Sequence, residues 1–437
     1  MAIEYLDFEL EMGAGPPDGS WPLSVIQSPA GNARGALGLP AAPDKLALQA
    51  QQLAAREIMA FGTQLFDALF PAGSVRDAYT ESLGVADARD RAVRLKLRIV
   101  DPALAAVPWE LIYDQRLGEF SALLYDTAIV RYVETAQPVK PLAITPPLRI
   151  LGMAVDPTHK LDLAAEKGAV AAALDDLIQR KLVELVWLEG GTWRDLQRSL
   201  RPDQGPWHVF HFVGHGGFDP TAQEGFLILA DDQGEPEALA GQELGRLLAR
   251  HSPLRLAFLN ACHGAVSAPA DLTTGIAGAL VRRGVPAVIA MQFALQDNTG
   301  IELGRTFYEA LAGGLPVEAA LTEARIAVSL AQRAALDWAA PVLYLRTPDG
   351  LLFELAVTAR RQSAPPNITR LTGTQFGQLH KALLSAFKGA TLRMMVRTGL
   401  DEDLDAIAGG SDQSAVVFNL IDWAQRTGRL SALIQAA

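Results

Sequence analysis

Two residues that could carry out acyl transfer stand at the ends of two apolar segments. Cys262, the only cysteine among 437 residues, lies in the segment Leu256-Ala-Phe-Leu-Asn-Ala-Cys-His-Gly264. His215 follows the apolar run Trp207-His-Val-Phe-His-Phe-Val213. An imidazole within hydrogen-bond reach of a thiol raises the fraction of thiolate, which is the reactive form. We therefore predict that Cys262 attacks a carbonyl carbon and that His215 is its general base.

Such a reaction also needs hydrogen-bond donors for the negative charge that develops on the carbonyl oxygen. Gly216 and Gly217 follow His215 directly, and glycine lets a backbone approach a ligand closely. We expect the amides of Gly216 and Cys262 to form this oxyanion hole. His263 comes directly after Cys262 and should point to the opposite side of the strand, so we do not expect it to be the base.

Two alternative interpretations use the same residues. Free cysteine is among the most buried residue types, so Cys262 taken alone indicates a structural role. A zinc site built from His211, His215, Cys262 and His263 is the second alternative. His211 and His215, however, lie on either side of a glycine at a strand end and do not share a helical face. We expect no metal, and we interpret His208 and His211 as packing residues.

The composition is that of a soluble globular protein with two or three domains. Hydrophobic residues make up 49% and charged residues 20%, and the net charge of −11 argues against nucleic-acid or anionic-membrane partners. The acidic N-terminus does not resemble a signal peptide, and no run of about 18 apolar residues suggests a membrane span. We therefore expect a cytoplasmic protein. The chain has no phosphate-binding loop of the G-x-x-x-x-G-K type, so no nucleotide or other cofactor is predicted.

Residues 1–140 look like an N-terminal α/β region. A strand is expected at Ile3–Leu10 and a long helix at Asp44–Phe70. The segment Ala92–Val100 alternates apolar and polar residues with period two, which is typical of a strand. Four prolines between Pro138 and Pro147 predict a boundary.

The block 148–355 alternates strand and helix. Most of its predicted strands are continuous apolar runs, which is typical of parallel strands covered on both faces. This order predicts a doubly wound, mostly parallel sheet with helices on both sides. The predicted strands are 148–155, 183–187, 209–213, 226–229, 254–259 and 287–292, and the predicted helices are 164–181, 192–200, 242–250, 274–283, 298–311 and 317–330.

The C-terminal part divides into a linker and a helical segment. Residues 356–367 include Arg360-Arg-Gln-Ser-Ala-Pro-Pro366, which indicates a linker. Residues 368–437 contain no clear strand-like run, and their apolar residues recur at helical spacing. We expect four or five amphipathic helices in a small all-α bundle.

The segments His211-Phe-Val-Gly-His-Gly216 and Leu259-Asn-Ala-Cys-His-Gly264 resemble the two motifs of the CHAT family, caspase-like peptidases related to separase. The spacing of about 50 residues from the histidine to the cysteine is also typical of caspase-like enzymes. The resemblance spans about residues 50–355 and implies a caspase-like fold and an endopeptidase with a Cys/His dyad and no metal. Other segments that carry it are Pro108-Trp-Glu-Leu-Ile112, Arg131-Tyr132, Ala290-Met-Gln-Phe293 with Asp297, and Trp338 with Pro341-Val-Leu-Tyr344.

The segments Leu371-Thr-Gly-Thr-Gln-Phe376 and Leu420-Ile-Asp-Trp-Ala424 resemble an effector-associated domain of bacterial conflict systems. The resemblance implies a helical module that couples an effector to a sensor or activator protein. A helical cap on the peptidase is the alternative interpretation.

Two acidic residues are candidates for substrate binding. Asp156 follows the strand at 148–155, and Asp297 follows the strand at 287–292. By resemblance to caspase-like folds, both loops border the pocket for the residue before the scissile bond (P1), where a carboxylate favours Arg or Lys. The alternatives are that Asp156-Pro157 starts a turn and that Asp297 caps a helix.

Two functions from different classes follow. The first is a regulated cytoplasmic cysteine endopeptidase that cleaves a partner protein in a bacterial immune or programmed-death system. The second is a non-catalytic caspase-like scaffold that acts through its C-terminal domain. His215, Cys262 and Gly216 together favour the peptidase.

Overall fold

The computed structural model divides the chain into two compact units, residues 1–356 and 357–437. The expected linker at 356–367 and the beginning of the helix expected from Asp44 lie outside the described residues. The structure describes residues 3–15, 19–40, 53–134, 139–219, 221–222, 224–263, 269–293, 297–331, 336–355, 376, 379–381, 383–384, 387, 389–400, 402–410, 412–427, 429–430 and 433.

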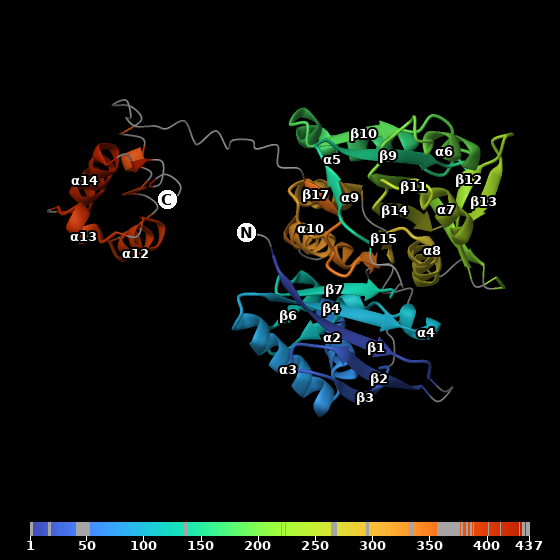
Figure 1. The fold of residues 1–437 in the computed structure, drawn as a ribbon, viewed down its shortest axis with the longest axis horizontal. Coiled ribbons are helices and arrows are strands. Elements are labelled where there is room, and N and C mark those ends of the chain that lie inside the picture. The colour runs from blue at the N-terminus through green and yellow to red at the C-terminus, as the bar shows by residue number, and fades with distance from the viewer. Residues whose placement is uncertain are drawn as a thin grey trace. The chain divides into compact units, whose positions relative to one another are not determined.

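The first unit is built on one sheet of 13 strands in the order β10-β9-β11-β14-β15-β16-β7-β4-β1-β2-β3, with β12 paired with β11 and β13 paired with β12 (Figure 1). These strands are β1 (Tyr5–Met12), β2 (Ser20–Gln27), β3 (Ala33–Gly38), β4 (Ala92–Ile99), β7 (Thr127–Tyr132), β9 (Leu148–Val155), β10 (Val183–Trp187), β11 (Val209–Asp219), β12 (Glu224–Ala230), β13 (Pro236–Ala240), β14 (Leu256–His263), β15 (Ala287–Met291) and β16 (Pro341–Leu345). Two small sheets pair β5 (Tyr113–Asp114) with β6 (Glu119–Phe120) and β8 (Leu142–Ile144) with β17 (Phe353–Leu355).

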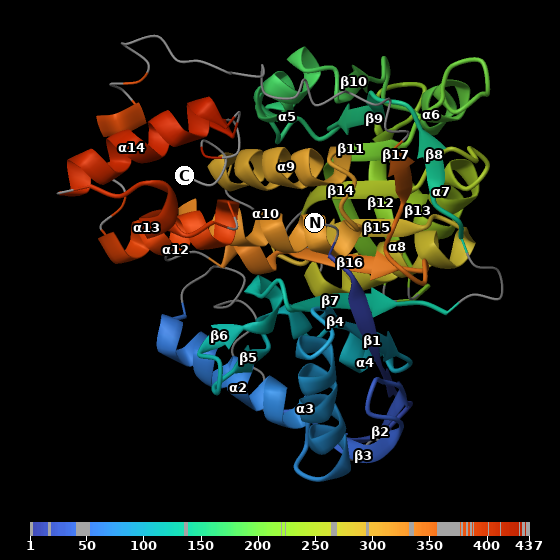
Figure 2. The ribbon, with the colours of Figure 1, turned by 60° about the vertical axis from the view of Figure 1, so that its left-hand side comes forward.

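Helices cover both faces of the half of the sheet that runs from β10 to β16. One layer contains α5 (Leu163–Gln179), α9 (Asp297–Ala312) and α10 (Val317–Ala331), which pack against one another. The other contains α7 (Gly241–Leu248) and α8 (Pro269–Arg283), with α6 (Trp193–Ser199) nearby (Figures 1 and 2). The strands between the layers are buried apolar runs, because a strand covered on both sides has no face to expose. The predicted doubly wound, mostly parallel α/β sheet is confirmed.

The N-terminal region joins this sheet instead of forming a sheet of its own. β16 pairs with β15 along one edge and with β7 in parallel along the other. The prolines at 138–147 therefore do not end the sheet, because the bridge between the two halves comes from β16, far along the chain. Around this half lie α2 (Ala55–Leu69), α3 (Ser74–Asp87), α4 (Pro102–Ala105) and the 3-10 turns Trp109–Leu111 and Ser121–Leu123, and Asp337–Ala339 forms a third such turn before β16.

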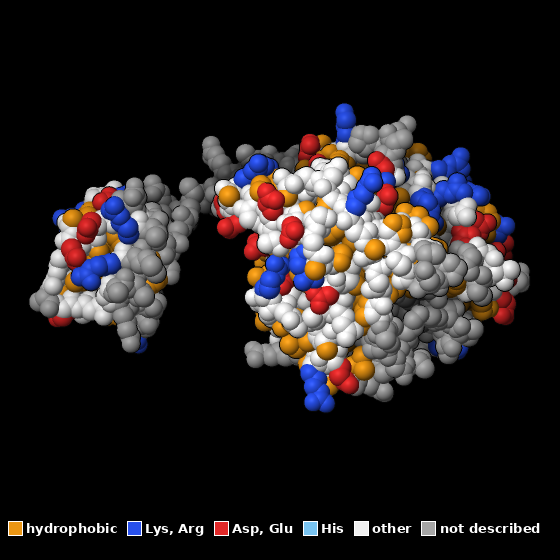
Figure 3. Space-filling view, turned by 90° about the horizontal axis from the view of Figure 1, so that it is seen from below, with side chains coloured by type: hydrophobic (Ala, Val, Ile, Leu, Met, Phe, Trp, Pro, Cys, Tyr) orange, Lys and Arg blue, Asp and Glu red, His pale blue; other side chains and the backbone are white. Residues whose placement is uncertain are grey.

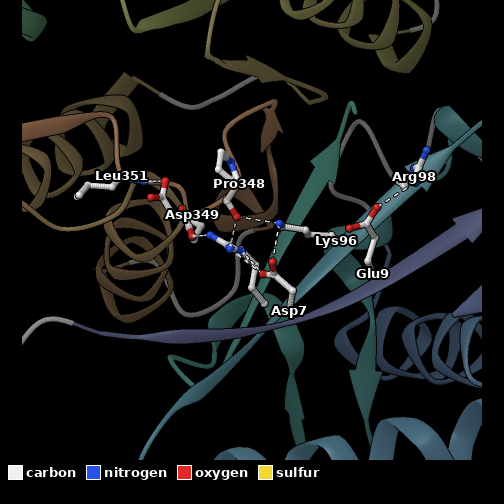
Figure 4. Close-up of polar contacts among 9 residues, drawn as sticks. Asp7, Glu9, Lys96, Arg98, Pro348, Asp349 and Leu351 are labelled. Carbon is white, nitrogen blue, oxygen red and sulfur yellow. Dashed lines mark hydrogen bonds and ion pairs between the residues drawn. The ribbon is translucent and has the colours of Figure 1, made fainter. Parts of the chain in front are cut away.

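The polar face of β4 is buried, although alternation of this kind often leaves one face to water. Arg94 donates hydrogen bonds to Asp7 at 2.8 Å and to Glu318 of α10 at 2.6 Å. Lys96 donates to Asp7 at 2.7 Å and to the carbonyl of Pro348 at 2.8 Å (Figure 4). This buried network ties β1 and β4 to α10 and to the loop after β16.

Two strands are longer than the sequence predicted. β11 extends to Asp219 because β12 folds back and pairs with it from His215 onward. A Cβ atom at Gly217 would stand 2.4 Å from the ring of Phe226 on β12, so glycine permits this close pairing. β14 extends to His263 along β11. His215 and Cys262 thus lie within strands, not just beyond them as the apolar runs suggested.

The second unit is helical where it is described, with α12 (Gly389–Leu400), α13 (Leu404–Ile407) and α14 (Gln413–Arg426). Its core includes Leu392, Val417 and Leu420, which are 0–1% exposed. Within the described part of the chain, none of the helices has the length and apolar character needed to cross a bilayer. Acidic and basic side chains are interspersed on the face of the molecule seen from below (Figure 3).

Candidate active site

The site lies where the order of the strands reverses. β9 comes first in this half of the sheet, β10 lies on one side of it and β11 on the other. In doubly wound sheets, ligands bind at the carboxyl ends of the strands next to such a reversal. Asp156 directly follows β9, and His215 lies toward the end of β11.

His215 and Cys262 are directly paired across the sheet. β11 and β14 run parallel, and their register sets His215 opposite Cys262 and Gly216 opposite His263. Neighbouring strands lie about 4.8 Å apart, and paired residues share a face of the sheet. The two residues of the predicted dyad are therefore neighbours on one face, whereas His263 belongs to the opposite face.

The loop after β9 surrounds the carboxylate of Asp156 with donors. The amide and the hydroxyl of Thr158 donate to Oδ1 at 2.9 and 2.6 Å, and the amides of Lys160 and Leu161 donate to Oδ2 at 2.6 Å each. Burial alone would raise the pKa of Asp156, but these hydrogen bonds outweigh it and lower the pKa to about 2. Asp156 therefore carries a negative charge at neutral pH.

This fixed charge faces the histidine. His215 Nε2 lies 3.2 Å from Asp156 Oδ1, and the two side chains are 7% and 1% exposed. The contact is an ion pair whenever the imidazole is protonated. Both carboxylate oxygens of Asp156 are thus bonded within the chain, and the substrate-binding role expected of it from the sequence stays a prediction.

Asp297, the second expected substrate-binding residue, is the first residue of α9. Its side chain lies outside the described residues, as do those of Cys262 and His263. The roles expected of these side chains, and of the Gly216 and Cys262 amides, therefore stay predictions.

Beneath the dyad lies His211, four residues before His215 on the same face of β11. Its Nδ1 is 2.8 Å from the hydroxyl of Tyr308 on α9, and its ring stacks on Phe258 at 4.9 Å. Burial lowers the pKa of His211 to about 4, so the ring is neutral at pH 7. The sequence predicted a packing residue, and these contacts fit one, but Nε2 has no hydrogen-bond partner among the described residues.

A buried ion pair, which was not predicted from the sequence, supports the loop that follows β15. Arg131 of β7 donates to Glu110 at 2.9 Å, and both residues are almost fully buried. Glu110 also accepts from the side-chain amide of Gln292 at 2.9 Å. The pair could have been suspected from the sequence, because the apolar segments Pro108–Ile112 and Thr127–Tyr132 each contain a charged residue and a buried charge needs a partner.

Among the described residues, no group of three or more His, Cys, Asp or Glu side chains is placed to hold a metal ion. The side chains of Asp156 and His215 suit proton transfer and the stabilisation of charge.

The sequence of the chain matches two known domain families. The CHAT domain family matches residues 59–346, which is more than half of the chain. The chain therefore belongs to the CHAT domain family, and the resemblance seen in the motifs is confirmed. Membership of this family, together with the α/β fold, supports a peptidase. Effector-associated domain 1 matches residues 369–437, which confirms the second resemblance.

Distant likenesses to solved structures involve cysteine peptidases. One is gingipain R, described as an Arg-specific cysteine proteinase (13% identity, 69% of each chain covered, TM-score 0.38). Another is separase in its complex with securin from Saccharomyces cerevisiae (14% identity, TM-score 0.35), which covers 69% of this chain and 22% of that one. Among curated proteins, none matches the sequence of this chain.

Proposed function

We propose that this chain is a cysteine endopeptidase in which Cys262 is the nucleophile and His215 the general base. The observation that carries the proposal is the register of β11 and β14, which pairs the only cysteine with a histidine that faces a buried carboxylate. A cysteine with only a structural role would need neither the histidine nor the carboxylate beside it.

The chemistry follows from these positions. His215 Nε2 lies beside Asp156, so Nδ1 is the nitrogen that takes the thiol proton of Cys262. The thiolate attacks the scissile carbonyl, and the amides of Gly216 and Cys262 stabilise the oxyanion. His215 returns the proton to the leaving amine, and water then hydrolyses the thioester. Asp156 acts as a positioning residue, because its fixed negative charge holds the imidazole and stabilises the imidazolium.

The C-terminal unit provides the regulation in this proposal. Its match to effector-associated domain 1 supports a helical module that binds a sensor or activator protein. We place the peptidase in the cytoplasm, in a bacterial immune or programmed-death system, where its target is a second protein of the same system.

The test compares cells that express the wild-type chain with cells that express Cys262→Ala. New protein N-termini are labelled and identified in both. We expect one or a few cleaved proteins that depend on Cys262. If the two variants give the same set of N-termini under conditions that activate the system, the chain is a scaffold and not a peptidase.

A further inference from the structure

A groove runs between α6 and α7, which lie side by side on one face of the sheet (Figures 1 and 2). Leu196 of α6 and Leu244 of α7 pack in one core cluster with Phe212 of β11. His215 is three residues after Phe212 on the same strand, so its side chain belongs to the opposite face. The groove is therefore separate from the candidate active site, and its use does not depend on the peptidase proposed above.

The groove consists of two hollows that join each other. One has a volume of about 590 Å³ and lies at the ends of the two helices, and the other, of about 680 Å³, lies between Trp193 and β13. Leu247 and Arg250 line both hollows, so the groove is continuous. Each hollow is within the range of roughly 300–1,000 Å³ that holds a small ligand, which leaves room for a peptide segment of several residues.

Positive charge gathers along this groove. Its lining contains four exposed arginines, Arg201, Arg246, Arg250 and Arg283. Among the described residues, the first three have no carboxylate partner, and Arg283 donates to the neutral side chain of Gln242 at 2.7 Å. A guanidinium has five N–H donors, so most of these donors are free for a ligand.

The two arginines of α6 that do not line the groove have partners within the chain. Arg194 lies 2.8 Å from Asp232, and Arg198 lies 3.1 Å from Asp195. The chain as a whole is acidic, with a net charge of −11. A cluster of cations without carboxylate partners on an acidic protein is complementary to a negatively charged ligand.

The other residues of the lining decide which anionic ligand fits. Glu237 and Glu243 also line the groove, and they repel the continuous phosphate backbone of a nucleic acid. A peptide avoids this repulsion, because it can set apolar side chains near them and carboxylates near the arginines. Trp193 and Leu247 are half-buried apolar residues of the lining against which such side chains can pack.

We propose that the groove between α6 and α7 is a docking site for an extended acidic segment of a partner protein. The carboxylates of the segment pair with the four arginines, since arginine binds carboxylates through two parallel hydrogen bonds. Its apolar side chains pack on Trp193 and Leu247. Docking there does not cover the face of the sheet that carries His215.

The test measures binding to the full-length chain with Cys262→Ala. The probes are the fluorescein-labelled peptide Glu-Leu-Glu-Glu-Leu-Glu-Glu and its counterpart with glutamine at every glutamate position. In fluorescence anisotropy at low ionic strength, we expect the glutamate peptide to bind at least about tenfold more tightly than the glutamine peptide. Added salt should reduce this preference.

The location of the site is tested with Arg246→Gln/Arg250→Gln, which should bring the two affinities to within about twofold of each other. The matched control Arg180→Gln/Arg198→Gln removes the same charge from exposed positions outside the groove and should keep the preference. Equal binding of the two peptides to the Cys262→Ala chain, or equal losses in the two double variants, would overturn the proposal.

A purely structural role of these arginines gives a different result. Arg246 lies in the last turn of α7 and Arg250 follows it, where a cation also stabilises the end of a helix. If Arg246→Gln/Arg250→Gln lowered the melting temperature but kept the preference for the glutamate peptide, the arginines would serve only the helix and the proposal would fail.

Two further measurements identify other occupants. If labelled oligothymidylate bound more tightly than the glutamate peptide and lost its binding in Arg246→Gln/Arg250→Gln, the groove would be a nucleic-acid site. If the chain without peptide formed a dimer in sedimentation that the same variant abolished, the occupant would be a second copy. Either result overturns the proposal. All chains carry Cys262→Ala, so failure of the peptidase proposal would leave these outcomes unchanged.

Discussion

The two halves of the 13-stranded sheet treat buried polar groups differently. In the half from β7 to β3, Arg94 and Lys96 are bonded to Asp7, to Glu318 Oε1 and to a backbone carbonyl, while Glu318 Oε2 has no hydrogen-bond partner among the described residues. In the half from β10 to β16, polar groups gather at the strand ends, and His211 Nε2 finds no partner among the described residues. Buried charges that neutralise one another indicate a structural role, whereas polar groups at the carboxyl ends of neighbouring parallel strands lie where doubly wound sheets bind ligands.

The largest effect is expected at the dyad. Cys262→Ala and His215→Ala should each lower kcat/KM by at least about a thousandfold, because the nucleophile and its base act as one unit. The fold should survive, which circular dichroism and thermal melting can check. His263→Ala is the matched control and should retain near-normal cleavage. The assignment of the base is wrong if the two histidine variants show the reverse pattern.

In the other half of the sheet, a single substitution should affect stability and not chemistry. Arg94→Met leaves Asp7 and Glu318 without their shared cation, and breaking a buried pair in this way typically costs about 3–5 kcal/mol. Urea unfolding followed by fluorescence measures the loss. Arg180→Met, which removes two exposed pairs, with Asp176 and Glu309, should cause no measurable change. If Arg94→Met lowered the free energy of unfolding as little as Arg180→Met does, the buried ion pairs of Arg94 would not stabilise the fold.

Acid should destabilise the active-site half through its buried histidines. Burial lowers the pKa of both His208 and His211 to about 4, so the unfolded chain binds protons between pH 6.5 and 4 that the folded chain does not. Stability should therefore fall as the pH drops through this window, by on the order of 3 kcal/mol per histidine at most.

Measuring the free energy of unfolding against pH in wild type and His208→Asn isolates one of these protons. The variant should have a shallower slope between pH 6.5 and 4. Asp156 and the other carboxylates are the same in both chains, so they cannot account for the difference between the two slopes. Identical slopes would mean that His208 is not held neutral.

The role of Asp156 gives a smaller effect with a distinct signature. Asp156→Asn removes the charge that faces His215, and we expect kcat/KM to fall about tenfold to a hundredfold for every P1 residue alike. Asp162→Asn is the matched control, because Asp162 caps α5 from the same loop and asparagine caps equally well. A loss confined to basic P1 residues would return Asp156 to the substrate pocket.

The smallest effect is expected from removing the second unit. A chain that ends at residue 356 keeps the first compact unit whole, so its melting temperature and its labelling at Cys262 should be unchanged. Only its response to the activator should be lost. Aggregation, or loss of the cooperative melt, would support the alternative of a helical cap.

Much of this architecture could be predicted because apolar runs are a local signal. The strand at 183–187 was predicted with its observed bounds, and α5 to within two residues at each end. The extension of β11 could not be predicted, because it depends on pairing with β12 across several glycines. The burial of Arg94 and Lys96 also depends on a distant element, α10, which no pattern within β4 reveals.

In the candidate site, too, some features could be predicted from the sequence and others could not. Cys262 and His215 could be named from residue type and spacing, and the register of β11 and β14 sets them opposite each other. The sequence suggested Asp156 for the substrate because it shows a carboxylate at a strand end, but not the four donors that surround it. His211 was predicted to be a packing residue, because a sequence does not show that its Nε2 atom has no hydrogen-bond partner among the described residues.

Because β11 pairs in register with β14, the site also depends on the number of residues in each strand. Side chains alternate between the two faces of a strand, so inserting one residue between Val209 and His215 would carry the histidine to the opposite face while the sheet could still form. Inserting two residues would return the histidine to the original face, but shifted by two residues along the strand relative to Cys262. We therefore expect related chains to have no insertions or deletions in these two strands. Differences in length should occur in the turns beyond Asp219, where they leave the register between His215 and Cys262 unchanged.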